Sequence, residues 1–215
     1  MLVPHPRASR ALENLARQLG FVHVAGVDEV GRGCLAGPVV AAAVVLDPTR
    51  YVAGIADSKV LTAAERERLY TRITRFAVSW HVSIIEPSEI DRLNIHKASL
   101  HAMRLAVTSL DPWPGFVLVD GFRIPDLAMA QRPVIGGDRR CTAIAAASIV
   151  AKVTRDRLML QLHAEDPRYG FDHHKGYATR EHLDAVARFG YSPIHRRTFR
   201  PPTLFDTIAD APIDE

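Results

Sequence analysis

The sequence predicts an α/β protein in which helices pack on a mixed β-sheet. Three observations lead to this class: strands come first, later strands alternate with helical segments, and glycines or acidic residues follow the strand ends. This order of elements is typical of a single sheet covered by helices. The 215 residues are sufficient for one domain with a substantial hydrophobic core.

A short helix and two strands are predicted in the first fifty residues. Apolar residues recur at helical spacing over residues 11–19, after a loose lead-in at residues 1–10. Residues 22–27 alternate as in a strand that ends at two acidic residues, and glycines then interrupt the chain. Residues 39–46 are continuously apolar, which is typical of a buried strand.

A helix, a strand and two further helices are predicted next. Thr62 and Glu65 form a capping-box pattern that begins a helix extending to about residue 76. Residues 77–85 alternate as in a strand, and Pro87 begins a short helix. Residues 95–110 form a longer helix. The apolar residues of the strand share one face: Val78, Trp80, Val82 and Ile84.

The second half of the chain alternates strands and helices. A proline-rich turn at residues 111–115 precedes a buried strand at residues 116–119. A short strand is predicted at residues 133–135 and the longest helix at residues 142–163, followed by a last helix at residues 179–189. From residue 192 onward, the chain is rich in proline and arginine and then acidic, so an extended or frayed segment is expected.

Charge is distributed unevenly along the chain. The net charge is +3, but residues 1–200 carry 27 basic and 20 acidic side chains, and only four of the basic residues are lysines. An arginine-rich body with an acidic tail fits phosphate recognition, and it fits a preference for arginine codons equally well. Two cysteines form no disulfide framework, and no apolar stretch reaches membrane length, so a cytoplasmic protein without membrane association is expected.

Carboxylates follow the predicted strands at three places. Asp28 and Glu29 end the first strand, Asp120 ends the strand at residues 116–119, and Asp138 precedes the longest helix. A carboxylate at a buried strand end is unfavourable unless it is paired or binds a cation. Oxygen ligands from several elements favour Mg²⁺ or Mn²⁺ over Zn²⁺. For each position taken alone, a turn or a helix cap is the alternative interpretation.

The loop Gly31-Arg32-Gly33 follows two of these carboxylates directly. Glycines let the backbone approach a ligand closely, so that its N–H and C=O groups can recognise a small polar group such as a hydroxyl. Arg32 would then hold an adjacent phosphate. A tight turn with an exposed arginine is the alternative interpretation of the same three residues.

Several ordered motifs resemble those of bacterial type 2 ribonuclease H, the ribonuclease HII family. The resemblance covers about residues 22–200. The matching segments, in chain order, are DEVGRG at 28–33, LAGPVVAA at 35–42, DSK-x-L at 57–61, VDG at 119–121, GD at 137–138, AAASIVAKVTRD at 145–156, HKGY at 174–177 and HRRTF at 195–199.

This resemblance implies a ribonuclease H-like mixed β-sheet flanked by α-helices, with a C-terminal helical extension. It also implies an endoribonuclease that hydrolyses the RNA strand of RNA–DNA hybrids and cuts 5′ to single ribonucleotides in duplex DNA, leaving 5′-phosphate and 3′-hydroxyl ends. A monomer is expected. The implied parts are a lead-in with a short helix at 1–20, a catalytic core at 21–165, a nucleic-acid-contacting segment at 166–200 and an acidic tail at 201–215.

The resemblance also implies roles for individual residues. Asp28, Glu29, Asp120 and Asp138 would bind two Mn²⁺ or Mg²⁺ ions that activate water and stabilise the leaving 3′-oxygen. The backbone of Gly31, Arg32 and Gly33 would recognise the ribose 2′-hydroxyl, and Tyr177 would stack on the sugar of the next deoxynucleotide. Five residues are candidate phosphate contacts, with solvated surface charges as the alternative: Lys59, Lys152, Lys175, Arg196 and Arg197.

The chain departs from the family pattern at Gly136, where relatives usually carry lysine, and Arg139 or Arg140 could replace that charge. Asp156 lies about 20 Å along the predicted helix, so we expect it to pair with Lys152 and not to join Asp138 at a metal. Two other classes remain alternatives. A DNA-processing enzyme of the same fold would not need the GRG loop, and a non-catalytic hybrid-binding protein would not need four carboxylates.

Overall fold

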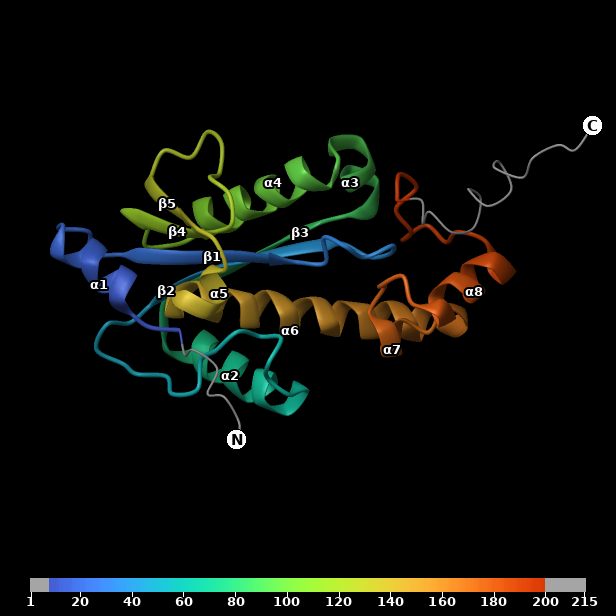
Figure 1. Cartoon of the computed structure of the whole chain (residues 1–215), viewed down its shortest axis with the longest axis horizontal. Helices are drawn as coiled ribbons and strands as arrows, with labels where there is room; N and C mark the ends of the chain where they lie inside the picture. Colours follow the sequence, from blue (N-terminus) through green and yellow to red (C-terminus); the bar gives the residue numbers. More distant parts are fainter. Residues whose placement is uncertain (1–7, 200–215) are drawn as a thin grey trace, which may run out of the picture.

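The computed structural model describes residues 8–199 and contains one five-stranded sheet in the order β3-β2-β1-β4-β5 (Figure 1). Strand β1 pairs antiparallel with β2 and parallel with β4, so the predicted mixed sheet is confirmed. The predicted acidic tail at 201–215 lies outside the described residues. The strands are β1 (Val24–Val30), β2 (Val39–Leu46), β3 (Ala77–Ile85), β4 (Phe116–Asp120) and β5 (Ala130–Val134).

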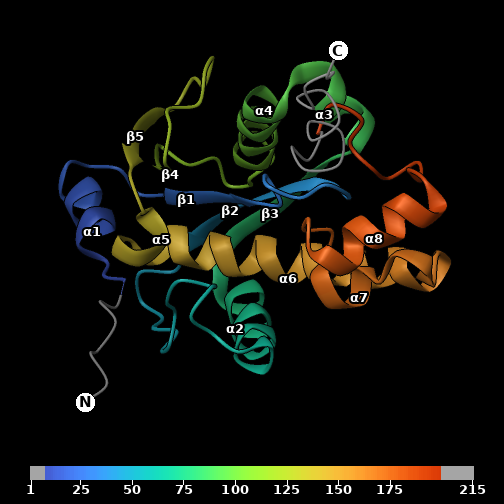
Figure 2. The same ribbon diagram turned by 45° about the vertical axis from the view of Figure 1, so that its right-hand side comes forward.

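Helices cover both faces of the sheet. Helix α4 packs on one face and helix α6 on the other, with α2 packed against α6 and also in contact with β3 (Figures 1 and 2). In the described chain, no helix is long and apolar enough to span a membrane. The helices are α1 (Ala11–Gln18), α2 (Ala63–Phe76), α3 (Pro87–Leu93), α4 (Ile95–Thr108), α5 (Gly137–Arg140), α6 (Thr142–Glu165), α7 (Phe171–His174) and α8 (Arg180–Phe189), with a 3₁₀ turn at Pro167–Tyr169.

Helix α6 lies very close to the centre of the sheet. Its first half is rich in alanine, and these small side chains are fully buried against β1 and β2. At Gly26 of β1, a Cβ atom would stand only 2.2 Å from the backbone carbon of Ala143. The strand therefore needs glycine at this position because the helix backbone occupies the space of a side chain.

We predict that Gly26→Ala lowers the free energy of unfolding by about 2–3 kcal/mol, since overpacking against a rigid backbone cannot be relieved by a side-chain rotation. Urea denaturation of the two proteins would measure the difference. A loss below about 0.5 kcal/mol would contradict the close approach, because surface substitutions alone produce changes of that size.

The N-terminal helix is fastened by an acidic side chain and less by its apolar face. The sequence predicted a helix with apolar residues on one side, but Leu15 and Leu19 are exposed while Glu13 is buried. The Glu13 carboxylate accepts a hydrogen bond from the Ala143 backbone N–H at 2.8 Å. It thus satisfies a free donor in the first turn of α6 and holds α1 against the start of that helix.

The apolar face predicted for residues 77–85 is the more exposed face of β3. Trp80 and Ile84 on that face remain partly exposed, because β3 is an edge strand. The opposite face carries buried serines, and the Ser83 hydroxyl donates a hydrogen bond to the Ala102 carbonyl of α4 at 2.5 Å. Packing against the helix backbone therefore decides which face of this strand is buried.

The segment after α8 folds back onto the core. We expected residues from 192 onward to be extended or frayed, but the part up to residue 199 is ordered by backbone contacts. The Arg196 N–H donates to the Leu35 carbonyl at 2.9 Å, and the Gly37 N–H donates to the Ile194 carbonyl at 2.8 Å. His195 and Arg196 are buried as a result.

Candidate active site

Two of the predicted carboxylates lie on adjacent parallel strands. Val27 of β1 stands opposite Val119 of β4, so Asp28 and Asp120 follow at the same level of the sheet. Asp28 and Glu29 lie inside β1 and pair with β2, and the strand continues to Val30, one residue beyond the two acidic residues at which the sequence predicted it to end. The parallel pairing therefore brings together carboxylates that are 92 positions apart in the sequence.

Asp138 joins this edge of the sheet through the short helix α5. The Gly137 backbone N–H donates to Asp120 Oδ1 at 2.7 Å, which connects α5 directly to β4. A Cβ on Gly137 would stand 3.1 Å from that oxygen and 2.5 Å from Ile144 Cδ1, so a side chain at this position would displace Ile144 and crowd Asp120. Lys59 Nζ donates to Asp138 Oδ2 at 3.1 Å. Strand β1, strand β4 and helix α5 thus supply the four carboxylates to one region.

The electrostatics of this cluster favour protonation when no cation is present. Burial and the charges of Glu29 and Asp120 raise the pKa of Asp28 well above its ordinary value. Burial also raises the pKa of Glu29, against the opposing effect of the Arg32 guanidinium. The pKa of Asp120 is raised by burial and by the charge of Asp138, although the Gly137 N–H opposes the shift. Several negative charges therefore share a space that water screens poorly.

The donor set fits a hard divalent cation. Glu29 Oε2 is buried and accepts no hydrogen bond, so one carboxylate oxygen is left without a partner. Among residues 8–199, no three His, Cys, Asp or Glu side chains are already arranged around one metal-sized position. Two of the carboxylates are ion-paired: Arg32 pairs with Glu29 at 3.1 Å and Lys59 with Asp138 at 3.1 Å. Oxygen ligands are those that Mg²⁺ and Mn²⁺ prefer.

The raised pKa values predict that the carboxylates destabilise the metal-free protein at neutral pH. A raised pKa in the folded state contributes stability below the unfolded pKa, and this contribution is lost as the pH rises through the folded pKa. Asp28→Asn removes one of the charges, so we expect it to stabilise the protein in EDTA at pH 7.5 by about 0.5–2 kcal/mol. Urea denaturation would measure this gain, which should shrink as the pH is lowered.

Asp126→Asn is the matched control for this experiment, because Asp126 is an exposed carboxylate on the loop that follows Asp120. Its effect on the free energy of unfolding should stay within about 0.5 kcal/mol at both pH values. If Asp28→Asn instead lowered stability at pH 7.5, the buried charge would not be the dominant destabilising term.

The Gly31-Arg32-Gly33 loop is held from behind by a buried guanidinium. Arg196 donates to the carbonyls of Gly31 at 2.6 Å, Arg32 at 2.8 Å and Gly37 at 2.9 and 3.0 Å. The side chain is fully buried, and burial lowers its pKa to about 10. This arrangement does not fit the phosphate contact that the sequence suggested for Arg196, because its donors are occupied inside the protein.

Tyr177 lies beside the same loop. It forms an isolated antiparallel bridge with Cys34, and its side chain remains 43% exposed. Lys175 directly precedes the Gly176-Tyr177 turn and donates its Nζ to the Asp172 carbonyl. Arg155, which is fully buried, donates to the Lys175 carbonyl at 2.9 Å and also to the carbonyls of Ala36 and Pro38.

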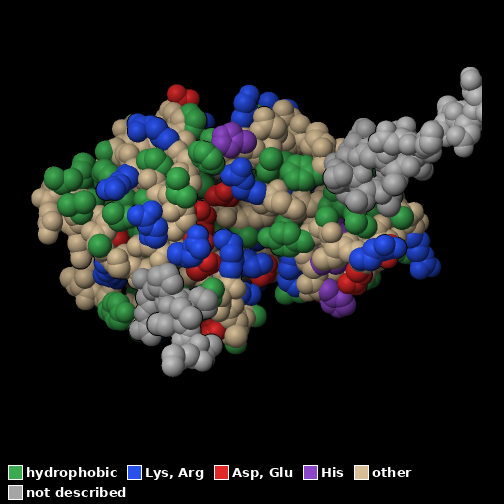
Figure 3. All heavy atoms as spheres, in the orientation of Figure 1, with side chains coloured by type: hydrophobic (Ala, Val, Ile, Leu, Met, Phe, Trp, Pro, Cys, Tyr) green, Lys and Arg blue, Asp and Glu red, His purple; other side chains and the backbone are tan. Residues whose placement is uncertain are grey.

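The remaining predicted phosphate contacts differ in exposure: Lys59 and Arg197 are exposed, whereas Lys152 and Lys175 are partly buried. The side chain of Lys59 is 79% exposed, so it can leave Asp138 for another anion. Lys152 pairs with Asp156 at 2.7 Å, which confirms the ion pair expected for Asp156. The backbone N–H of Arg197 donates to Asp91 at 2.8 Å. Figure 3 shows Lys and Arg side chains around carboxylates near the middle of one face.

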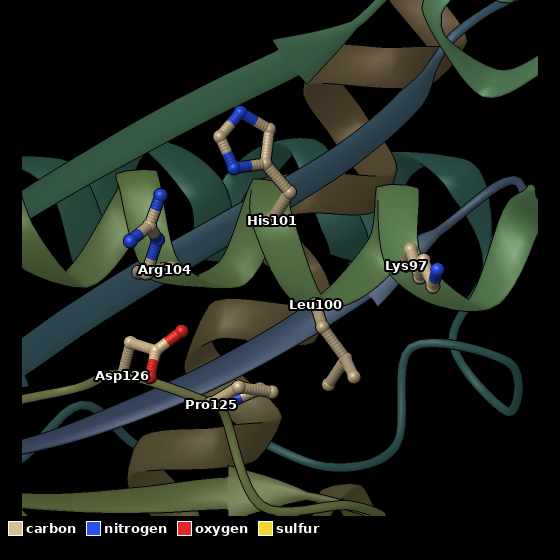
Figure 4. Close-up of a pocket in the computed structure, with 6 residues that line it drawn as sticks. All are labelled: Lys97, Leu100, His101, Arg104, Pro125 and Asp126. Atoms are coloured by element: carbon tan, nitrogen blue, oxygen red, sulfur yellow. The ribbon is translucent and has the colours of Figure 1, made fainter. Parts of the chain in front are cut away.

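A separate surface pocket lies between α4 and the loop after β4 (Figure 4). Three basic side chains of one helix face line it together with a proline and an aspartate. None of the four carboxylates contributes to it, so this hollow is distinct from the candidate active site. The lining residues are Lys97, Leu100, His101, Arg104, Pro125 and Asp126.

The sequence did not reveal the residues that hold these loops. Arg155 belongs to a matched motif, but the sequence analysis predicted no function for it. Its neighbours at helical spacing, Ala151 and Met159, are apolar and indicate a buried position. Ser148 is buried and shares a hydrogen bond of 2.9 Å with Ser58, and it also contacts Asp28. Cys34 and Cys141 are free and buried, in agreement with the expectation that the two cysteines form no disulfide framework.

A mixed five-stranded sheet that carries carboxylates on its two central strands β1 and β4 and on the adjoining helix α5 is typical of a metal-dependent nuclease with a ribonuclease H fold. A model of the family described as Ribonuclease HII matches residues 25–201. The chain therefore belongs to the ribonuclease HII family, whose members are hydrolytic endonucleases.

Individual relatives agree with this assignment. Ribonuclease HII of Mycobacterium avium is 52% identical over 192 residues, which cover 88% of this chain and 84% of that protein. Ribonuclease HII of Nocardia farcinica is 53% identical over 193 residues, covering 89% and 77%. Among solved structures, ribonuclease H2 from Pyrococcus horikoshii has a TM-score of 0.70 and 27% identity, with 83% of this chain and 94% of that chain covered.

The ribonuclease HII of Archaeoglobus fulgidus, solved in a complex with PCNA, also has a TM-score of 0.70. It is 25% identical in sequence and covers 86% of this chain and all of that chain. The predicted ribonuclease H-like fold with a C-terminal helical region is confirmed by these similarities and by the sheet order.

Proposed function

We propose that this endoribonuclease hydrolyses the RNA strand of RNA–DNA hybrids and cuts 5′ to single ribonucleotides in duplex DNA, leaving 5′-phosphate and 3′-hydroxyl ends. The observation that carries the proposal is the convergence of the carboxylates beside a glycine loop whose residue Arg32 contacts Glu29. A carboxylate cluster suits phosphodiester hydrolysis, and a close-approach loop suits recognition of a 2′-hydroxyl.

Asp28, Glu29, Asp120 and Asp138 would hold two Mn²⁺ or Mg²⁺ ions. When bound, the ions supply Lewis-acid stabilisation and a water of lowered pKa. The chain itself fixes the geometry around them, because the Gly137 N–H orients Asp120 and the Glu29 N–H donates to Asp28 Oδ1 at 2.7 Å. No serine, cysteine or histidine nucleophile is required.

The surrounding residues would hold the duplex. The backbone of Gly31, Arg32 and Gly33 recognises the ribose 2′-hydroxyl, and Tyr177 stacks on the sugar of the following deoxynucleotide. Basic side chains position the phosphates without reading the base sequence. Arg196 drops out of this group because it is buried. The phosphate contacts are Lys59, Lys152, Lys175 and Arg197.

The test uses a DNA duplex with one ribonucleotide, labelled on the strand that contains it, beside an all-DNA duplex and a uniform RNA–DNA hybrid. With Mn²⁺ or Mg²⁺, we expect one cut 5′ to the ribonucleotide, cleavage of the hybrid, and no reaction in EDTA. The labelled products would be separated on a denaturing gel and the new ends tested with phosphatase and ligase.

Two other results would replace the proposal. Cutting of the all-DNA duplex would favour a DNA-processing enzyme of the same fold. Binding of the hybrid without any cleavage, measured by fluorescence anisotropy, would favour a hybrid-binding protein that is not an enzyme.

A further inference from the structure

Two consecutive residues of the C-terminal segment, His195 and Arg196, connect the two parts of the chain that we propose recognise the substrate. These parts are the Gly31-Arg32-Gly33 loop and Tyr177. The Leu35 N–H donates to the Gly176 carbonyl at 2.8 Å, and the Arg196 N–H donates to the Leu35 carbonyl at 2.9 Å. His195 also forms an isolated antiparallel bridge with Ala36. Three distant segments therefore form one hydrogen-bonded layer.

From this layer, the Arg196 side chain reaches the Gly31-Arg32-Gly33 loop. Its guanidinium is fully buried and donates to the carbonyls of Gly31 and Arg32. A planar guanidinium with several donors can hold two or three carbonyls at fixed positions, which a single ammonium group cannot do. The conformation of the Gly31-Arg32-Gly33 loop is therefore set by a residue 163 positions or more further along the chain.

The His195 side chain is connected to the backbone of Tyr177 through His182. The Tyr177 carbonyl can only accept, so His182 Nδ1, at 2.9 Å from it, must donate. In a neutral ring His182 Nε2 then accepts, and it receives the Nε2–H of His195 at 3.0 Å. His195 Nδ1 is left to accept from the Ser192 N–H at 3.0 Å and the Ser192 hydroxyl at 2.8 Å.

The surroundings keep the hydrogen-bonded rings of His182 and His195 uncharged. Burial lowers the pKa of both His182 and His195 to about 4. The ring of His174 stacks on His182, with centroids 4.4 Å apart, and its Nδ1 accepts the Gly176 N–H at 3.2 Å. Buried histidines thus fix the backbone of Gly176 and Tyr177 by two independent hydrogen bonds.

We propose that His182, His195 and Arg196 are positioning residues that fix Tyr177 relative to the Gly31-Arg32-Gly33 loop and so set the preference for a ribonucleotide followed by a deoxynucleotide. This inference rests on the proposed function of these two elements. Arg196 fixes the position of the loop that binds the 2′-hydroxyl, and the histidine pair fixes the position of Tyr177, which stacks on the next sugar.

The experiment compares kcat/KM for a single ribonucleotide in DNA with kcat/KM for a uniform RNA–DNA hybrid, with Mn²⁺. His195→Leu removes the donor to His182, so we expect the ratio of the two values to fall about tenfold. A loss of folded protein would lower both values equally and leave the ratio unchanged. His195→Gln can place an N–H near the same position and should restore most of the ratio. His173→Gln is the matched control, since His173 is an exposed histidine in the neighbouring helix α7.

A double-mutant cycle tests whether His195 acts through Tyr177. In a Tyr177→Ala background, His195→Leu should change the ratio by less than about twofold, because the positioned side chain is already absent. Fully additive effects, or an unchanged ratio in a folded His195→Leu variant, would overturn the inference.

A second measurement needs no variant. Nitrogen-15 NMR of the wild-type protein at pH 7 should show His182 protonated at Nδ1 and His195 protonated at Nε2, both neutral. The opposite tautomers, or charged rings, would overturn the inference even if a variant failed to fold. If the wild-type protein cleaves neither substrate while the tautomers are as expected, the proposed function fails and the positioning geometry stands apart from it.

Discussion

Asp120→Asn is expected to lower kcat for a ribonucleotide-containing duplex by roughly a thousandfold or more. Bound metal ions supply several kcal/mol of transition-state stabilisation, and each ~1.4 kcal/mol corresponds to a factor of ten in rate. Asp120 is central in the cluster, because it lies beside Asp28 on the neighbouring strand and accepts the Gly137 N–H. Single-turnover cleavage at saturating Mn²⁺ would measure the loss.

The substitution should not disturb the fold. An asparagine side-chain oxygen can still accept the Gly137 N–H, and one buried negative charge is removed. Binding of the labelled duplex in EDTA, measured by anisotropy, should therefore stay within about threefold of the wild-type value. Asp126→Asn, on the loop that follows the same strand, should retain wild-type cleavage. Full activity of Asp120→Asn would exclude this carboxylate as a metal ligand.

Much of the fold could be predicted because local signals agree with the tertiary structure. The strands at residues 39–46 and 77–85 have the predicted bounds, and the capping box of Thr62 and Glu65 is present. The short helices α5 and α7 were missed, since four residues carry no helical periodicity. Local sequence patterns also could not predict which face of β3 is buried, because that face depends on a hydrogen bond to the backbone of α4.

The candidate site divides in the same way. The positions of the carboxylates after apolar runs, together with the family motifs, predicted the candidate metal ligands. The sequence could not show that parallel pairing of β1 and β4 places Asp28 beside Asp120, because the two residues are 92 positions apart and local patterns do not reveal which strands pair. The phosphate contact that the family resemblance implied for Arg196 does not fit its burial, and neither does the alternative of a solvated surface charge. Burial and hydrogen bonds to distant carbonyls are tertiary properties.

The two glycines of the reading loop should behave in opposite ways when they are replaced by alanine. Gly31 has a φ of +91°, and a Cβ there would stand 2.3 Å from Arg155 Nε and 2.9 Å from the Pro38 carbonyl. Gly31→Ala therefore adds backbone strain to a steric clash, and we expect a loss of stability of several kcal/mol. At Gly33 a Cβ would meet no atom within 4 Å, so the glycine is not required by the protein's own packing.

Gly33→Ala should accordingly leave the free energy of unfolding within about 0.5 kcal/mol of wild type but lower kcat/KM for the ribonucleotide-containing duplex about a hundredfold. The added methyl group would occupy space from which the ribose must approach the backbone, and a displacement of about 1 Å is enough for such a loss. Urea denaturation and steady-state cleavage of the same preparation would separate the two effects. Wild-type cleavage by a stable Gly33→Ala variant would show that the substrate does not approach the loop at Gly33. Recognition of the 2′-hydroxyl would then have to rest on the Gly31 and Arg32 side of the loop, where the buried guanidinium of Arg196 already fixes the carbonyls.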